Sequence, residues 1–245
     1  MSRLGRSHIL AIGGGSFRPT PRYGFLEPSG LLRYALDLTG EDRPRLCLLA
    51  TAMGDDPGWL LKMYTAFHGW DVEISHLTVF PMPNVDDPRE FLLQQDVIYV
   101  SGGSVANLMA LWRLHGLDEA LAEAWRAGVV LAGQSAGALC WHVGGNTDSF
   151  GPRLRPWKDG MGLLPYSCGV HYNSEPQRRP LLHRSIAEGE LPDGYAADEG
   201  VALHYVGTEL VQAVSVDPKG AAYRVERDGS GGVKELRLEP RLLSR

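Results

Sequence analysis

One serine in the chain stands where a nucleophile would be expected. The segment Val129–Leu139, VVLAGQSAGAL, is a short apolar run followed by Gly-x-Ser-x-Gly, with Ser135 at its centre. This pattern predicts a buried strand that turns sharply into a helix, with small residues at a strained corner that a substrate approaches closely. The hydroxyl of Ser135 would be exposed there, beside the positive end of the helix. The pentapeptide alone is equally compatible with a glycine-rich turn whose serine only caps the helix.

A serine nucleophile needs a base, and the chain contains eight histidines. Four of them precede Ser135 on predicted strands or helices. His142 follows it on what we expect to be the same helix, about 10 Å along the axis and therefore too far away. His171 ends a short β-like run just before a predicted helix, which would support a reactive side chain rigidly. We expect structural roles for His183, in the middle of that helix, and for His204, in a strand.

An acid must orient the base, and the residues leave three choices open. Asp148 lies in an irregular segment, whereas Asp198 and Glu199 come just before a predicted strand. The oxyanion of an acyl transfer needs backbone N–H groups aimed at the developing charge. The amide of Ala136, directly after the serine, is one candidate. The glycine turn at Gly102–Gly103 is the candidate for the other.

Alternating strands and helices must position these groups. The apolar runs predict strands at 8–12, 45–50, 71–79, 96–100 and 129–134, and helical spacing of apolar residues predicts helices at 29–39, 57–68, 105–112, 117–127 and 177–188. This alternation indicates a parallel sheet covered by helices on both faces. Reactive groups in such sheets gather at the carboxyl ends of the strands, where Gly13–Gly15, Gly102–Gly103 and Ser135 all fall.

The pattern changes after the serine. Residues 144–162 are rich in Gly, Pro, Asn and Asp and predict a long irregular loop. From Gly200 onward we expect short strands at 201–206, 210–216, 221–226 and 233–238, which would complete one edge of the domain as a β-rich, antiparallel part. The sequence shows no repeat, low-complexity segment or linker. We therefore predict a single α/β domain over residues 1–245.

The composition is that of an ordinary soluble globular protein, with 44% hydrophobic and 22% charged residues. The formal net charge of -5, without a basic patch, gives no support to a nucleic-acid partner. No apolar run approaches the roughly 18 residues of a membrane span, and the first one is too short for a secretory signal. The three cysteines are far apart, so we expect no zinc site, no structural disulfide and a cytoplasmic location. We also expect no cofactor, because Arg18 stands where a dinucleotide fingerprint needs a third glycine.

Three segments together resemble the peptidase E family, which contains aspartyl dipeptidases and the related cyanophycinases. The segments are Ser101–Leu108 (SGGSVANL), Gly133–Ala138 (GQSAGA) and His171, and the resemblance runs from about Ile9 to Val216. It implies a flavodoxin-like or class I glutamine amidotransferase-like fold, a mostly parallel sheet between helices, that carries a serine peptidase site. The substrate would be a small peptide, and a homodimer is a candidate assembly.

The resemblance also implies roles for particular residues. It makes Ser135 the nucleophile and His171 the general base. The oxyanion amides fall at Gly103 and Ala136, with Gly102 beside the substrate.

For the acid, two positions match the family. Glu199 lies in the turn Ala197–Gly200, which matches the short acidic-glycine turn that the family has before a strand. We favour Glu199 for this reason. Asp148 is the second candidate, after a gap of about two residues in the match.

Family members with dipeptidase activity prefer an N-terminal aspartate, whose carboxylate suits a planar guanidinium. Arg178 falls at or beside the family's arginine position, with Arg179 next to it; the alternative is an arginine at a solvated helix start. The chain departs from the dipeptidases at Gly169–Val170, where they have Asn-Pro, and at Gln134 and Leu139, where they have Trp and Asn. The departures leave Asp-X specificity open.

Two other hypotheses are compatible with the fold. An α/β-hydrolase esterase would place its histidine near the end of the chain, after the acid, and would carry a His-Gly-Gly oxyanion turn, but no histidine follows His204. A catalytically silent member of the fold would bind a small molecule or a partner protein. The presence of Ser135, His171 and two acids argues against a silent member.

Overall fold

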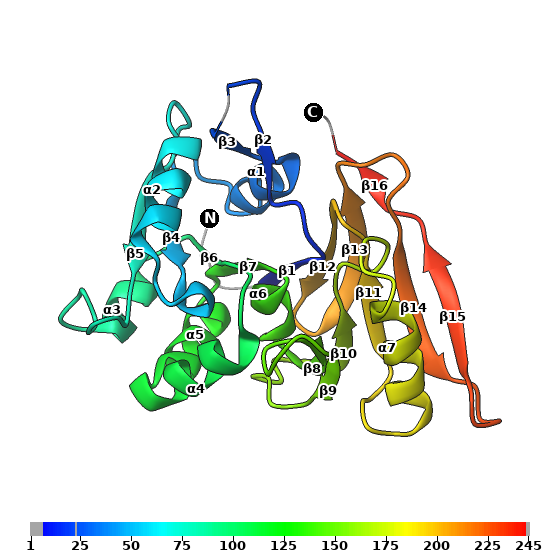
Figure 1. The fold of residues 1–245 in the computed structure, drawn as a ribbon. Coiled ribbons are helices and arrows are strands. Elements are labelled where there is room, and N and C mark those ends of the chain that lie inside the picture. Colours follow the sequence, from blue (N-terminus) through cyan, green and yellow to red (C-terminus); the bar gives the residue numbers. More distant parts are fainter. Residues whose placement is uncertain (1–6, 23, 244–245) are drawn as a thin grey trace.

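The computed structural model describes residues 7–22 and 24–243 and contains two large β-sheets with helices packed around them (Figure 1). The larger sheet has eight strands in the order β16-β13-β12-β1-β7-β6-β4-β5. Their bounds are β1 (His8–Ile12), β4 (Arg45–Leu49), β5 (Glu73–Leu77), β6 (Val97–Val100), β7 (Val130–Gln134), β12 (Val201–Val206), β13 (Glu209–Ser215) and β16 (Arg241–Leu242). The strands from β1 to β5 in this order pair in parallel, and β12 pairs antiparallel with β1 and β13.

Helices cover both faces of this sheet. Successive side chains of its strands point to opposite faces, and both sets are apolar, so both faces must be buried. In β1, Ile9 and Ala11 belong to one buried cluster, and Leu10 and Ile12 belong to another. Helices α4 (Val105–His115) and α5 (Leu117–Arg126) pack on the first cluster, and α1 (Gly30–Asp37) and α2 (Pro57–Ala66) pack on the second. In Figure 1 the first pair lies below the strands and the second pair lies above them. The predicted α/β architecture, with a mostly parallel sheet between helices, is confirmed.

The helix starts follow from local capping chemistry. The side chains of Ser29, Asp56 and Ser104 accept hydrogen bonds from backbone N–H groups in the first turns of α1, α2 and α4. Proline at the first position of α2 gives up no hydrogen bond there. Gly116, with a φ of 68°, ends α4 and allows α5 to begin at once.

The second sheet has six strands in the order β15-β14-β11-β10-β8-β9. They are β8 (His142–Thr147), β9 (Arg155–Trp157), β10 (Leu164–Gly169), β11 (Gly194–Ala197), β14 (Ala222–Arg227) and β15 (Val233–Leu238). Helix α7 (Arg178–Ala187) covers one face, where its Leu182 and Ile186 join a buried cluster with Tyr223 and Val225. Figure 1 shows this sheet beside the larger one, with β15 at its outer edge.

The second sheet corrects two expectations about the chain after the serine. The segment 144–162 is not an irregular loop throughout: it contains most of β8 and all of β9, which pair antiparallel from Gly145↔Trp157 to Thr147↔Arg155. The last strands do not complete one common edge either. β12 and β13 extend the larger sheet, whereas β14 and β15 extend the smaller one.

The prediction of one helix that runs from the serine through His142 is also wrong. Helix α6 spans only Ala136–Leu139, and His142 begins β8. The buried His142 ring places Nδ1 2.8 Å from the carbonyl oxygen of Ala138, so a side chain satisfies a carbonyl that a longer helix would have satisfied.

Four short elements complete the described chain. The strands β2 (Phe17–Pro19) and β3 (Leu26–Pro28) form a separate hairpin, and the 3₁₀ helix η1 (Thr51–Met53) and helix α3 (Pro88–Leu93) follow β4 and β5. None of these elements was predicted. In Figure 1 the hairpin projects above α1.

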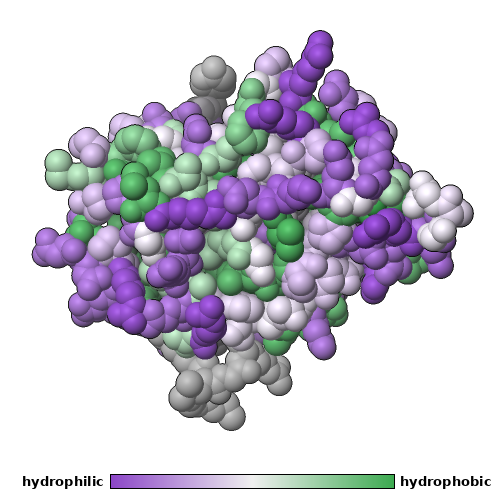
Figure 2. Space-filling view, turned by 90° about the horizontal axis from the view of Figure 1, so that it is seen from below, coloured by the Kyte–Doolittle hydropathy of each residue, from purple (hydrophilic) through white to green (hydrophobic). Residues whose placement is uncertain are grey.

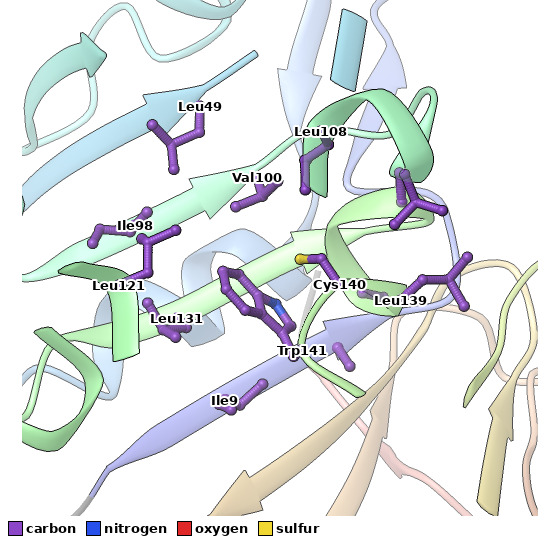
Figure 3. Close-up of a cluster of buried hydrophobic side chains, with 14 of the residues drawn as sticks. Ile9, Leu49, Ile98, Val100, Leu108, Leu121, Leu131, Leu139, Cys140 and Trp141 are labelled. Carbon is purple, nitrogen blue, oxygen red and sulfur yellow. The ribbon is translucent and has the colours of Figure 1, made fainter. Parts of the chain in front are cut away.

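The residues after the nucleophile candidate are anchored in the core. Figure 3 shows Trp141 beside Ile9 and Leu131 of the larger sheet, with Cys140 and Leu139 farther along the same buried cluster. All of these side chains are 2% exposed or less, and the Trp141 ring lies 5.9 Å from the Trp112 ring. Burying a large apolar side chain contributes about 1.5–3 kcal/mol. The corner at Ser135 therefore rests on fully buried side chains of the core.

The face seen in Figure 2 carries hydrophobic residues in several patches that hydrophilic residues separate. Within the described residues, none of the helices has both the length and the apolar character that crossing a bilayer requires.

Candidate active site

Ser135 occupies the corner between β7 and α6. Its backbone φ of 54° and ψ of -110° lie in a region that residues other than glycine rarely adopt. The Ser135 N–H donates to the carbonyl of Ile12 at 3.1 Å, and its own carbonyl accepts from the N–H groups of Ala138 and Leu139 at 2.9 Å. Neighbouring backbone thus holds the strained conformation in place, as a nucleophile elbow would require.

The glycines on either side of Ser135 are required by close backbone contacts. A Cβ atom on Gly133 would overlap the carbonyl of Gly137, and one on Gly137 would overlap the carbonyl of Val100. Small residues here let α6 pack directly on β6 and β7. The Gly-x-Ser-x-Gly spacing therefore has a steric cause in this fold.

His171 lies on the turn that follows β10. Its φ is 52°, and its backbone N–H donates to the carbonyl of Gly13 at 3.1 Å. The ring Nδ1 is 2.8 Å from Oε2 of Glu199. With a proton on Nδ1 donated to this carboxylate, Nε2 is left as the free acceptor nitrogen of the ring. The His171 side chain is 19% exposed, so the ring is reachable but largely enclosed.

Glu199 is itself held by the turn that carries His171. The Glu199 N–H donates to Oδ1 of Asn173 at 2.8 Å. A Cβ atom on Gly14 would overlap the Glu199 carboxylate, and the N–H of Gly200 donates to the Gly14 carbonyl at 3.0 Å. The sequence analysis did not identify Asn173 as a residue of the site. The only feature of the sequence that could have indicated it is its position two residues after His171.

Ser135 and His171 line one cavity of about 310 Å³. Gly102, Gly103 and Gln134 line it on the side of the strand ends, and the other lining residues are Phe17, Met53, Trp59 and Tyr99. A Cβ atom on Gly102 would lie 3.3 Å from the Ser135 Cβ, so the glycine turn passes directly beside the serine. Gly103 has a φ of 131°, and a Cβ there would overlap the carbonyl of Ala52. Sequence reasoning missed the aromatic walls, since they come from separate segments.

Asp148 lies apart from this group. It lines a different cavity, of about 270 Å³, together with Glu175 and other residues of the segments 152–154 and 174–177. The structure therefore brings Glu199 to His171 and places Asp148 at another cavity.

Arg178 is also placed away from the Ser135 cavity. Its side chain is 5% exposed; Nε donates to Glu175 at 2.7 Å and Nη1 donates to the carbonyl of Asn146 at 2.7 Å. Arg179 forms an ion pair with Glu235. Both guanidinium groups are thus engaged within the protein, and neither lines the cavity that contains Ser135.

The histidines expected to be structural have partners elsewhere. His183 Nε2 is 2.8 Å from Glu235, and His204 lies between the Tyr34 hydroxyl at 2.8 Å and His8 at 2.9 Å. Burial lowers the pKa of His204 to about 4, so it is neutral at pH 7. Among the described residues, no group of three His, Cys, Asp or Glu side chains is arranged to hold a metal ion.

Comparisons with known proteins agree on one family. The family model for Peptidase family S51 matches residues 9–213, a span that contains Ser135, His171 and Glu199. The uncharacterized peptidase YgaJ of Bacillus subtilis is 44% identical over 217 residues, which cover 89% of this chain and 91% of that protein. Peptidase E of Streptomyces coelicolor is 28% identical over 177 residues, which cover 66% of this chain and 70% of that protein.

A solved structure shares the fold. The crystal structure of a peptidase from an acI-B1 Actinobacterium matches with a TM-score of 0.68 at 19% identity, covering 98% of this chain and 96% of that one. At this identity the likeness concerns the α/β fold alone.

Proposed function

The chain belongs to peptidase family S51, and from this membership we propose that it is a serine peptidase that hydrolyses short peptides through an acyl-enzyme. The observation that carries the proposal is the position of one histidine. His171 lines the same cavity as the strained Ser135, and its Nδ1 is bound to Glu199 at 2.8 Å. A nucleophile, a base and an orienting acid are the three parts that acyl transfer by serine requires.

In the proposed reaction, Nε2 of His171 takes the proton from the Ser135 hydroxyl as the oxygen attacks the scissile carbonyl. The backbone N–H groups of Gly103 and Ala136 hold the oxyanion. His171 then gives the proton to the leaving amine, and the C–N bond breaks. A water molecule, deprotonated by His171, attacks the acyl-enzyme and releases the acid and the free serine. Throughout, Glu199 keeps the imidazole in the required tautomer and stabilises its charged form.

The cavity is at the small end of the range for ligand sites, which suits one or two residues of a peptide. Peptides with an N-terminal aspartate are the substrate class that the peptidase E resemblance suggests, and they belong in any substrate panel. Arg178 is not expected to bind their carboxylate, because its guanidinium already binds Glu175 and the carbonyl of Asn146.

Labelling and cleavage together test the proposal. A fluorophosphonate probe should label the wild type and fail to label Ser135→Ala. Against a pool of short peptides, both Ser135→Ala and His171→Ala should lower the rate by at least about 10³-fold. Ser230→Ala, at an exposed serine between β14 and β15, is the matched control and should keep full activity. If either of the first two variants is folded and keeps more than a few per cent of the wild-type rate, the assignment is wrong.

A further inference from the structure

The walls of the Ser135 cavity are apolar and come from three separate elements. Phe17 lies at the start of β2, Met53 in η1 and Trp59 in α2. The Phe17 ring packs edge-on against Tyr99 at 5.8 Å and against Phe67 at 6.0 Å. These contacts fix the ring before any ligand arrives. The cavity therefore presents a preformed apolar surface next to the nucleophile candidate.

A hydrogen bond within the site also holds this wall in place. Oε1 of Gln134 accepts from the backbone N–H of Ser16 at 2.8 Å. Gln134 immediately precedes the nucleophile, and Ser16 immediately precedes Phe17. The bond therefore fixes the position of the aromatic wall relative to Ser135.

The described part of the chain places no guanidinium or ammonium group in the lining. None of the nine described residues that line this cavity is a lysine or an arginine. Arg18 lines a neighbouring cavity of about 460 Å³, which shares Phe17 with the Ser135 cavity, and its guanidinium is paired with Glu27 at 2.9 Å. A carboxylate that entered the Ser135 cavity would lose water without gaining a cationic partner, whereas an apolar side chain would gain contact with Phe17, Met53 and Trp59.

We infer that this cavity binds an apolar side chain of the residue whose carbonyl is attacked, so that the enzyme cleaves after Leu, Met or Phe in preference to Asp. The inference rests on the proposed function. It follows from the position of the glycine turn: Gly102 and Gly103 share the cavity with the apolar walls. When a scissile carbonyl lies against the Gly103 amide, the side chain of the same residue has the apolar walls beside it.

A matched set of p-nitroanilides tests this preference. The Leu, Met, Phe and Asp compounds share one leaving group and differ only in the side chain, and each is assayed with a free and with an acetylated amino group. We expect kcat/KM for the best apolar compound to exceed that for Asp by at least about tenfold, a typical discrimination for an apolar pocket. Ser135→Ala should abolish cleavage of every compound.

A charge placed in the wall should reverse the preference. Met53 is 42% exposed, so Met53→Arg can fold, and it should raise the Asp-to-Leu ratio of kcat/KM by at least about tenfold. Met82→Arg makes the same change at a methionine that is 67% exposed and does not line the cavity, and it should leave the ratio unchanged.

Three outcomes count against the inference. Ser135-dependent cleavage that favours Asp in the wild type overturns the apolar subsite and leaves the proposed function standing. An equal change of the ratio in Met53→Arg and Met82→Arg also overturns the subsite. No Ser135-dependent cleavage of any compound, together with no fluorophosphonate labelling, overturns the proposed function and the inference with it.

Discussion

His171 and Glu199 are 2.8 Å apart at Nδ1 and Oε2, and both are tied to the same glycine turn after β1. The His171 N–H donates to the carbonyl of Gly13, and the N–H after Glu199, on Gly200, donates to the carbonyl of Gly14. The pair therefore does not depend on one side-chain contact alone. The turn that follows the first strand positions the histidine and the acid, and a larger residue at Gly14 would displace the carboxylate.

The first prediction distinguishes the two candidate acids. Glu199→Gln should lower kcat by about 10³- to 10⁴-fold with little change in KM, because the amide cannot stabilise the charged imidazole of His171. Asp148→Asn should change kcat by less than about threefold, since Asp148 lines another cavity. Steady-state kinetics on any cleaved peptide measure both.

The two variants are controls for each other, because each replaces one carboxylate by its amide. Circular dichroism should show both folded. A large loss of kcat in Asp148→Asn with a small loss in Glu199→Gln would reverse the assignment of the acid.

The parallel strands could be predicted from the sequence because local signals specify them. Runs such as Leu46–Leu49 and Val97–Val100 are continuously apolar and buried, as strands covered on both faces must be. Glycines or small polar residues follow several of them and mark the strand ends. The helices between them have recognisable caps and apolar spacing.

The strands β8 and β9 could not be predicted, because the residues that form them resemble a loop. A Cβ atom on Gly144 would overlap the carbonyl of Trp157, and one on Gly145 would overlap the carbonyl of Cys168. Glycine is needed here for close packing between strands, but in sequence glycine signals a turn. Only contacts between distant segments decide whether such a glycine lies in a strand or in a turn.

The residues of the candidate site likewise fall into those that the sequence predicted and those that only the structure reveals. The motifs and the family resemblance together named Ser135, His171 and Glu199, and their roles remain predictions. The sequence already favoured Glu199 over Asp148 as the acid, and the structure adds the contact between His171 and Glu199, which are 28 residues apart. The apolar walls of the cavity come from segments with no common spacing, so no sequence pattern could have indicated them.

A second prediction concerns the packing of the serine corner. Gly137→Ala should lower the free energy of unfolding by about 2 kcal/mol, since the new methyl group would overlap the carbonyl of Val100 and force α6 away from β6. For a chain of this size the melting temperature should fall by about 4–8 °C.

Gly58→Ala is the matched control for this change. It makes the same substitution in the first turn of α2, where the new Cβ would lie 3.2 Å from Oδ1 of Asp56, the exposed side chain that caps this helix, and would overlap no backbone atom. Alanine favours a helix over glycine, so the melting temperature should stay constant or rise slightly. Equal melting temperatures for Gly137→Ala and the wild type would show that α6 can move without cost.

A third prediction concerns the dependence of stability on pH. Burial lowers the pKa of His142 from 6.5 to about 4, and its ring lies 2.8 Å from the Ala138 carbonyl and 3.3 Å from the Tyr205 hydroxyl. Above pH 6.5 neither state binds the proton. As the pH falls from 6.5 towards 4, the unfolded chain binds a proton that the folded one excludes, so the free energy of unfolding decreases.

Urea unfolding at pH 7.5 and pH 5.0 measures this effect. Between these values His142 should remove about 2 kcal/mol of stability from the wild type, and His204, whose pKa burial also lowers to about 4, should act in the same direction. His142→Gln, which can still donate to Ala138 and accept from Tyr205, should lose about 2 kcal/mol less than the wild type over the same interval. His68→Gln, at an exposed histidine, should behave like the wild type. If His142→Gln and the wild type lose equal stability on acidification, the buried ring is not the group that excludes the proton.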